Sequence, residues 1–123
     1  MKESWENKVK IEDTKFEVFN NIIEFIYTDE VQLSDIDMVI NLLIEANKFS
    51  LQRLKSICEA HLSQIIDQDN VNQLLHLADI HEASELRWIC MDYAVWYFSL
   101  ITKRKDFDLL SKSTIVDIVK RSN

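Results

Sequence analysis

The stretch NLLIEANKFSLQRLKSIC, residues 41–58, decides the fold, because its apolar pattern returns as QLLHLADIHEASELRWIC at residues 73–90. Six residues are identical between the two stretches, each 32 positions further along the chain, as from Leu42 to Leu74. In each copy Leu-Leu and Ala share one face of a helix, and Leu, Ile and Cys share one face of the next. The small alanine allows the two helix axes to approach closely. The pattern predicts one helical hairpin used twice, with the copies stacked, because a single hairpin cannot bury its own apolar face.

Composition favours helices joined by short turns. The chain of 123 residues contains no glycine and no proline, and 47% of its residues are hydrophobic. Tight hairpins, Gly-rich phosphate loops and dinucleotide-binding turns need a residue that adopts positive φ at low cost, and glycine is the usual one. Such loops are therefore excluded. The turns must be made by Asp, Asn, Ser and Thr, which also cap helices.

Apolar periodicity predicts an all-α fold, a helical bundle of stacked hairpins with six or seven helices. The first helix has apolar residues at 16, 19, 22, 23 and 26. Ser34 and Asp37 are spaced as in a capping box, and Ser50 is expected to cap the third helix. Alternation at Val9 and Ile11 allows at most one short N-terminal strand, which has no convincing partner strand. The expected helices span residues 15–27, 34–49, 50–65, 71–80, 84–102, 104–110 and 113–120.

Charge and cysteine content restrict the partners and the compartment. The formal net charge is −7, whereas a protein that binds nucleic acid needs a basic face. The basic run at residues 103–105 is interpreted as a solvated helix end. No apolar run approaches the ~20 residues of a membrane span, and the polar start does not resemble a signal peptide. Cys58 and Cys90 lie in apolar helical patterns, so we expect buried thiols in a reducing intracellular compartment, cytoplasmic or nuclear.

No set of residues for catalysis, for a cofactor or for a metal ion emerges from the spacing. His76 and His81 are five residues apart, which does not place them on one helix face. Cys58 and His61 could share a face, but a buried cysteine beside a half-buried histidine explains that pair without a metal. We expect a binding protein that is not an enzyme and has no small-molecule substrate. The competing interpretation is a small helical enzyme or metal protein.

The fifth expected helix is crowded with aromatic residues that one apolar stripe cannot bury. Its second apolar side has members at spacings of 3, 4 and 3: Trp88, Met91, Val95 and Phe98. A helix that is apolar on two sides is either central to a bundle or half of an interface. The central position is the favoured interpretation. A protein-binding surface that includes Trp88 and Trp96 is the functional alternative.

Several short motifs follow one another along the chain. They are VKIED (9–13), FEVF (16–19), FIYTD (25–29), LLxxANKF (42–49), LxRLxxxCE (51–59), NVxxLLxLAD (70–79), FxxLS (107–111) and IVxI (115–118). Their order resembles the BTB/POZ family, followed by a BACK domain. The resemblance implies the C-terminal half of a BTB/POZ domain at residues 1–66 and a BACK-type helical domain at 67–123. Speckle-type, leucine-zipper-like regulator, Rho-related BTB and kelch proteins share this pattern, and the tail is most similar to the leucine-zipper-like regulator.

This resemblance implies a partner. Many family members bind the N-terminal domain of cullin-3 and act as adaptors that bring substrates to a ubiquitin ligase for ubiquitination. A hydrophobic-x-Glu motif just before the short strand is typical of cullin binders, and Met1-Lys2-Glu3 stands there in this chain. Met1 would fill an apolar pocket and Glu3 would order the loop. Tyr27 lies near the expected cullin face, and the groove between the BTB and BACK parts would take the N-terminal segment of the cullin.

The chain departs from the family in one respect. Motifs of the first half of a BTB domain, with its sheet and its usual dimer helix, are not found, so the chain resembles a fragment or a truncated member. The departure implies that the usual dimer does not form, that the cullin face is incomplete and that some apolar surface is bare. Motifs of domains that recognise a substrate are not found in this sequence either. The alternative function is a homo-oligomerisation or scaffold module without cullin binding, with the fifth helix supplying the interface.

Overall fold

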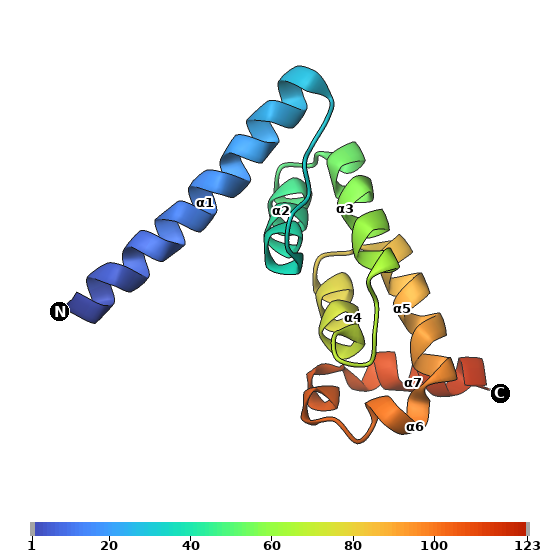
Figure 1. Ribbon diagram of the computed structural model, residues 1–123. Coiled ribbons are helices and arrows are strands. Elements are labelled where there is room, and N and C mark those ends of the chain that lie inside the picture. Colours follow the sequence, from blue (N-terminus) through green and yellow to red (C-terminus); the bar gives the residue numbers. More distant parts are fainter. Residues whose placement is uncertain (1, 123) are drawn as a thin grey trace. The chain divides into compact units, whose positions relative to one another are not determined.

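The chain is all-α wherever its structure, a computed structural model, describes it, namely the backbone of residues 2–122 and the side chains of residues 15–122. This confirms the predicted fold class. Residues 8–12 are helical, and no strand occurs within residues 2–122 (Figure 1). A helix pairs its own backbone groups, whereas a lone strand would leave them unpaired. The elements in order are α1 (Lys2–Thr28), α2 (Ile36–Lys48), α3 (Gln52–Gln64), α4 (Val71–Ile80), α5 (Ser84–Trp96), α6 (Phe98–Ile101), the 3₁₀ helix η1 (Lys105–Leu109) and α7 (Lys112–Ser122).

The helix predicted over residues 84–102 is interrupted at Tyr97. This residue has φ −117° and ψ 29°, so it ends α5 and begins α6. Its ring stacks on that of Tyr93, with the centroids 4.5 Å apart. The break redirects α6, which buries Ile101 and brings Phe98 edge-on to Phe107 with 6.3 Å between the ring centroids. Tertiary packing of these apolar residues therefore overrides the continuous helical period.

The chain divides between Cys58 and Glu59 into two compact units. In the first unit α1 packs on α2. The buried side of α1 consists of Val18, Ile22 and Phe25, so only Ile22 of the stripe read from the sequence is buried. Because α1 is apolar on two sides, its period could not show which side α2 covers. The buried residues of α2 are Met38, Val39, Leu42, Leu43 and Ala46.

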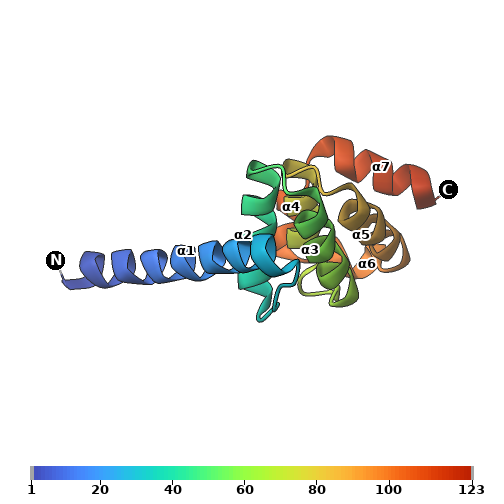
Figure 2. The same cartoon turned by 90° about the horizontal axis from the view of Figure 1, so that it is seen from above.

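The second unit is built around α5, which packs against α4 and α7, while η1 lies against α4 (Figure 2). Leu74 of α4 and Leu86 of α5 are fully buried. Arg87 links three helices, because its Nε lies 3.3 Å from Asp79 Oδ1 and its Nη2 lies 3.1 Å from Asp117 Oδ2. Apolar burial supplies most of the stability of such a unit, and the polar contacts fix the register of its helices.

The two copies of the internal repeat also have the same backbone conformation in the turn between their helices. Ser50 does not cap the third helix as predicted; it ends α2 with a φ of 58°. The Leu51 N–H donates to the Ala46 carbonyl over 2.8 Å, which is the Schellman helix ending that glycine usually makes. The second copy repeats this 32 positions later, with a φ of 56° at Glu82 and a 2.9 Å bond from the Ala83 N–H to the equivalent carbonyl. A chain without glycine thus places ordinary residues in the left-handed region at both turns.

The two copies differ in how closely their helices pack. α4 and α5 lie in close contact along their lengths, as the repeat predicted. In the first copy α2 packs more extensively on α1 than on α3. The stacking of one copy on the other stays a prediction.

The start of α2 is capped by Asp35 and not by Ser34 as predicted. Asp35 Oδ1 accepts a hydrogen bond from the Met38 N–H over 2.8 Å. A carboxylate at this position also complements the positive end of the helix dipole, so it stabilises the helix start more than a serine would.

The start of α5 has no cap from its own flanking residues, because Ala83 carries no polar side chain. The buried carboxylate of Glu59 replaces it from α3. Its Oε1 accepts the Glu85 N–H over 3.1 Å and the Leu86 N–H over 3.2 Å. A cap of this kind is worth about 1 kcal/mol. Glu59 was not singled out for a cap by sequence reasoning, because its partners are distant along the chain.

Cys58 and Cys90 are both buried thiols, as predicted. Burial raises the pKa of Cys90 from its ordinary 9.0 to about 12, so the reactive thiolate is scarce at neutral pH. We expect iodoacetamide to leave Cys90 unmodified in the native protein and to alkylate it fully in guanidinium chloride. Mass spectrometry of the two samples measures this. Rapid alkylation of Cys90 under native conditions would contradict its burial.

Candidate protein-binding site

Two tryptophans are exposed on one face of α5. Trp88 is 60% exposed and Trp96 is 84% exposed. Together with Glu85, Ile89 and Asp92 they recur at steps of three and four residues, and we call these five residues the α5 outer face. The favoured prediction, that both apolar sides of this helix are buried at the centre of a bundle, is wrong for Trp88. Although α5 packs against α4 and α7, both tryptophans stay largely exposed, which favours the interface alternative.

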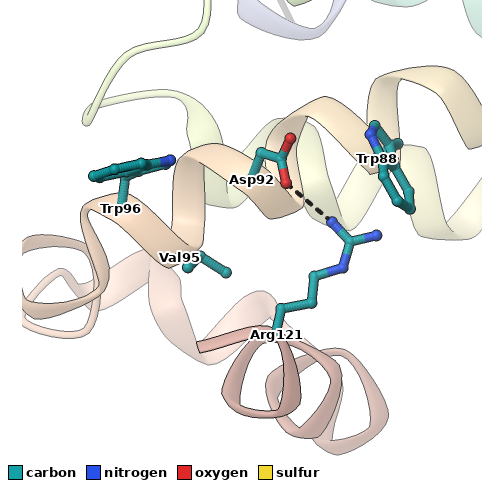
Figure 3. Close-up of a pocket in the computed structure, with 5 residues that line it drawn as sticks. All are labelled: Trp88, Asp92, Val95, Trp96 and Arg121. Atoms are coloured by element: carbon teal, nitrogen blue, oxygen red, sulfur yellow. Dashed lines mark hydrogen bonds and ion pairs between the residues drawn. The ribbon is translucent and has the colours of Figure 1, made fainter. Parts of the chain in front are cut away.

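Arg121 of α7 reaches over the α5 outer face. Its guanidinium carbon lies 4.0 Å from the centroid of the Trp88 ring, and its Nη1 lies 3.3 Å from Asp92 Oδ1 (Figure 3). A cation over an exposed indole is worth about 0.5–1 kcal/mol, and an exposed ion pair contributes no more than about 1 kcal/mol. With Val95 and Trp96 these residues line a shallow hollow of about 250 Å³. The guanidinium is therefore held by modest forces that a partner could compete with.

A second hollow shares Trp88 with the first. It has a volume of about 350 Å³ and is lined by Ser84, Glu85, Trp88 and Ile89. Among the described side chains that line it, Glu85 is the charged one. Trp88 therefore lines both a hollow whose carboxylate, Asp92, is paired with Arg121 and a hollow that offers the carboxylate of Glu85.

Another exposed apolar surface, the α1 stripe, lies on the first unit. Phe16, Phe19, Ile23 and Ile26 follow each other at spacings of 3, 4 and 3, and all are exposed, as is Tyr27 at 85%. Scattered exposed apolar residues are common on proteins, but a contiguous stripe of this kind marks an interaction site. The structure thus provides two aromatic surfaces, one on each unit.

Polar contacts fix the chain just after Tyr27. Thr28 Oγ1 accepts the Glu30 N–H over 3.2 Å, just beyond the last turn of α1. Asp29 adopts a φ of 62° and forms an ion pair with Arg53 of α3. Because the turn is held in this way, the Tyr27 ring is presented at a defined place on the surface.

The residues predicted for binding fall into two groups. Tyr27, Trp88 and Trp96 are placed on the surface, as a role in binding requires. Met1 lies outside the described residues. Glu3 belongs to α1, but its side chain is outside the described part as well. The roles of Met1 and Glu3 therefore stay predictions.

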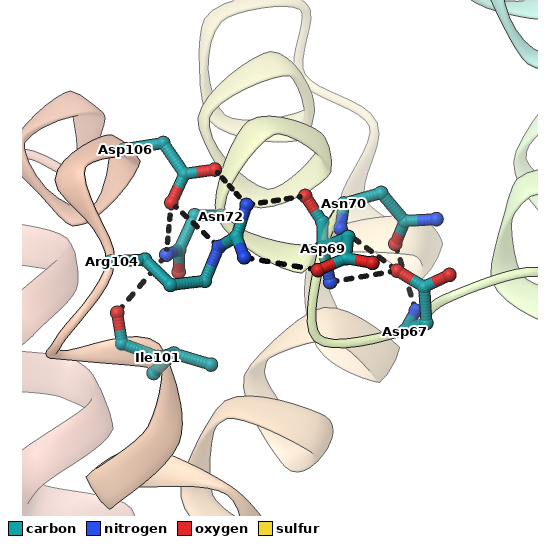
Figure 4. Close-up of polar contacts among 7 residues, drawn as sticks. All are labelled: Asp67, Asp69, Asn70, Asn72, Ile101, Arg104 and Asp106. Carbon is teal, nitrogen blue, oxygen red and sulfur yellow. Dashed lines mark hydrogen bonds and ion pairs between the residues drawn. The ribbon is translucent and has the colours of Figure 1, made fainter.

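Sequence reasoning missed a polar cluster that joins α4 to η1. Arg104, interpreted from the sequence as part of a solvated run, has Nη1 3.0 Å from Asp69 Oδ1 and Nε 3.3 Å from Asp106 Oδ1 (Figure 4). The buried Asn72 donates from Nδ2 to Asp106 Oδ1 over 2.8 Å and to the Ile101 carbonyl over 3.3 Å. Two carboxylates already match the Arg104 cation, so this polar cluster is a structural clamp and not an anion site.

The clamp depends on an ionised Asp106. Burial alone would raise the pKa of this carboxyl, but the hydrogen bonds from Asn72 and Arg104 outweigh burial and hold the pKa below its usual 3.8. The Asn72 amide has only one orientation that suits its neighbours, because reversing it would set its oxygen against two acceptors. In the observed orientation Asn72 Oδ1 is buried with no partner among the described residues. Asn72 Nδ2 thus makes one short and one longer hydrogen bond, while Asn72 Oδ1 remains an unsatisfied acceptor.

Comparison with protein families gives the class to which these surfaces belong. The family model of the BTB/POZ domain matches residues 1–66, and that of BACK (BTB And C-terminal Kelch) matches residues 71–123. The chain belongs to the BTB/POZ family. Its second match makes it a BTB–BACK chain, which confirms the family predicted from its motifs.

BTB and BACK domains are protein–protein interaction modules and not enzyme families, and BTB domains also mediate oligomerisation. This class of function fits the exposed aromatic surfaces of the BTB–BACK chain. Among the side chains that the structure describes, no three His, Cys, Asp or Glu gather where they could hold a metal ion. Over the same residues, no helix is both long enough and apolar enough to cross a membrane.

Proposed function

We propose that this BTB–BACK chain is an adaptor of a cullin-3 ubiquitin ligase and that it acts by binding alone. The observation that carries the proposal is the exposed Tyr27 at the end of the α1 stripe, within the BTB match. Protein interfaces commonly centre on aromatic anchors surrounded by apolar side chains. Met1 and Glu3 would add the hydrophobic-x-Glu motif, with Met1 filling an apolar pocket on the cullin and Glu3 ordering the chain beside it.

The two parts of the chain have different roles in this proposal. Residues 1–66 serve as the C-terminal half of a BTB domain and contact the N-terminal domain of cullin-3 through Tyr27. Residues 67–123 serve as a BACK-type helical domain and present the α5 outer face. Supporting this division, most of the exposed aromatic residues described in the first unit lie on α1, with Phe49 at the end of α2, and those of the second lie mainly on α5.

Calorimetric titration with the N-terminal domain of cullin-3 tests the proposal. Tyr27→Ala is expected to weaken binding about tenfold or more, because truncating an aromatic anchor typically costs at least ~1.4–2 kcal/mol. Glu3→Lys should weaken it too. Trp96→Ala, which changes an equally exposed ring on the second unit, is the matched control and should bind like the wild type. Absence of binding by the wild type, or equal binding by Tyr27→Ala, would overturn the proposal.

A second candidate function is homo-oligomerisation through the α5 outer face, without cullin binding. The exposure of both Trp88 and Trp96 favours it, because monomers seldom leave two neighbouring indoles bare. Light scattering over a range of concentrations should then give at least a dimer mass that reverts to the monomer in a Trp88→Ser, Trp96→Ser double variant. A monomer mass at every concentration would exclude this candidate.

A further inference from the structure

Trp88 lies between two carboxylates on the α5 outer face, and only one of them is paired with a cation. Asp92, one turn after Trp88, holds the Arg121 guanidinium 4.0 Å from the indole centroid. Glu85, one turn before Trp88, takes part in none of the ion pairs formed by the described side chains. Its backbone N–H is held by Glu59, so the position of Glu85 at the start of α5 is fixed.

The contact with Arg121 shows which kind of side chain an indole next to a carboxylate binds on this face. The Arg121 guanidinium lies beside the Trp88 indole and the Asp92 carboxylate, and Val95 and Trp96 line the same hollow. The second hollow likewise has an indole, a carboxylate and an aliphatic side chain in Trp88, Glu85 and Ile89, together with the hydroxyl of Ser84. Its volume of about 350 Å³ exceeds the roughly 250 Å³ of the hollow that Arg121 lines, and it leaves room for a side chain beside the Trp88 ring. Its chemistry therefore complements a planar cation on an aliphatic stem.

We infer that the hollow beside Glu85 binds an arginine side chain from a segment of a partner protein. The guanidinium stacks on the Trp88 indole and donates hydrogen bonds to the Glu85 carboxylate. Arginine fits better than lysine, because its planar fork both stacks on a ring and matches a carboxylate with two donors. The net charge of −7 also attracts a basic segment. The inference rests on the proposal that the α5 outer face binds protein, and it names the chemistry of that partner.

The test uses the full chain labelled with ¹⁵N and a short blocked peptide with one arginine among neutral residues. A second peptide replaces arginine by citrulline, which has the same shape without the charge. The indole N–H signal of Trp88, assigned from a Trp88→Phe variant, should shift with the arginine peptide and saturate. The citrulline peptide should leave it in place. Equal shifts with both peptides, or no shift with either, would overturn the inference.

Two variants locate the binding to this hollow. Glu85→Gln is expected to weaken the arginine peptide about fivefold, which corresponds to ~1 kcal/mol. Arg121→Gln removes the cation of the neighbouring hollow but keeps Glu85, so it should bind at least as well as the wild type. Unchanged affinity in Glu85→Gln would contradict the assignment. Both positions are on the surface, and circular dichroism confirms that the variants fold. Cullin-3 titration depends on Tyr27 and not on Glu85, so the two proposals fail independently.

Discussion

Leu86→Asp is expected to unfold the second unit at room temperature, or to lower its free energy of unfolding by at least about 4 kcal/mol. Leu86 is fully buried on α5, which packs closely on α4. The substitution removes the apolar contacts of a leucine, worth about 2–5 kcal/mol, and places a carboxylate where water cannot solvate it. Since domains of this size are stable by only about 5–15 kcal/mol, a large part of that stability is lost.

Urea denaturation followed by circular dichroism measures this effect. The matched control is Leu109→Asp, which makes the same chemical change at an exposed leucine of η1 in the same unit. The control should alter the free energy of unfolding by less than about 0.5 kcal/mol. If the two variants unfolded at the same urea concentration, the burial of Leu86 and the packing of α4 on α5 would both be wrong.

Asp106→Ala is expected to lower the free energy of unfolding by about 1–3 kcal/mol. The substitution leaves the buried Asn72 Nδ2 with only its longer bond to the Ile101 carbonyl, and it removes one of the two carboxylates that hold Arg104. Asp108→Ala, two residues further along η1 and exposed, is the control and should be nearly neutral. Thermal or urea denaturation of the three proteins gives the comparison, and equal effects of both substitutions would show that the clamp contributes nothing.

The same carboxylate predicts a dependence on pH. Because folding lowers the pKa of Asp106, its charge contributes stability that is fully present above the usual value of 3.8. That stability is lost as the pH falls through the lower pKa of the folded state. The difference in free energy of unfolding between the wild type and Asp106→Asn should therefore shrink at acid pH below 3.8. A difference that stays constant over that range would contradict the role of the ionised form.

The helices were predictable because the spacing of apolar residues along the chain is a local signal. The internal repeat contains this spacing in both of its copies. α3 spans Gln52–Gln64 and α5 spans Ser84–Trp96, so the second begins and ends 32 residues after the first. The left-handed turns at Ser50 and Glu82 have the same offset. Periodicity could predict the elements, but it could not show that both turns would use ordinary residues in place of glycine.

The contacts that complete the fold were not predictable, because they join residues far apart in the sequence. Arg104 meets Asp69 across 35 positions, and Glu59 caps the start of α5 across 27 positions at Leu86. No local pattern distinguishes such an arginine from a solvated one. The exposure of Trp88 was missed for a related reason, since a helix with two apolar sides has the same period whichever side its neighbours cover.

The central claim is that this chain binds a protein partner through the exposed aromatic end of α1. Hydrogen–deuterium exchange of the chain, with and without a saturating amount of the N-terminal domain of cullin-3, tests it most directly. The account predicts that amides in the segment 16–30, which includes Tyr27, exchange more slowly in the complex, while those of α7 are unchanged. If the amides of residues 16–30 exchanged at the same rate with and without cullin-3, the claim would be contradicted. Protection of other segments would not change that conclusion.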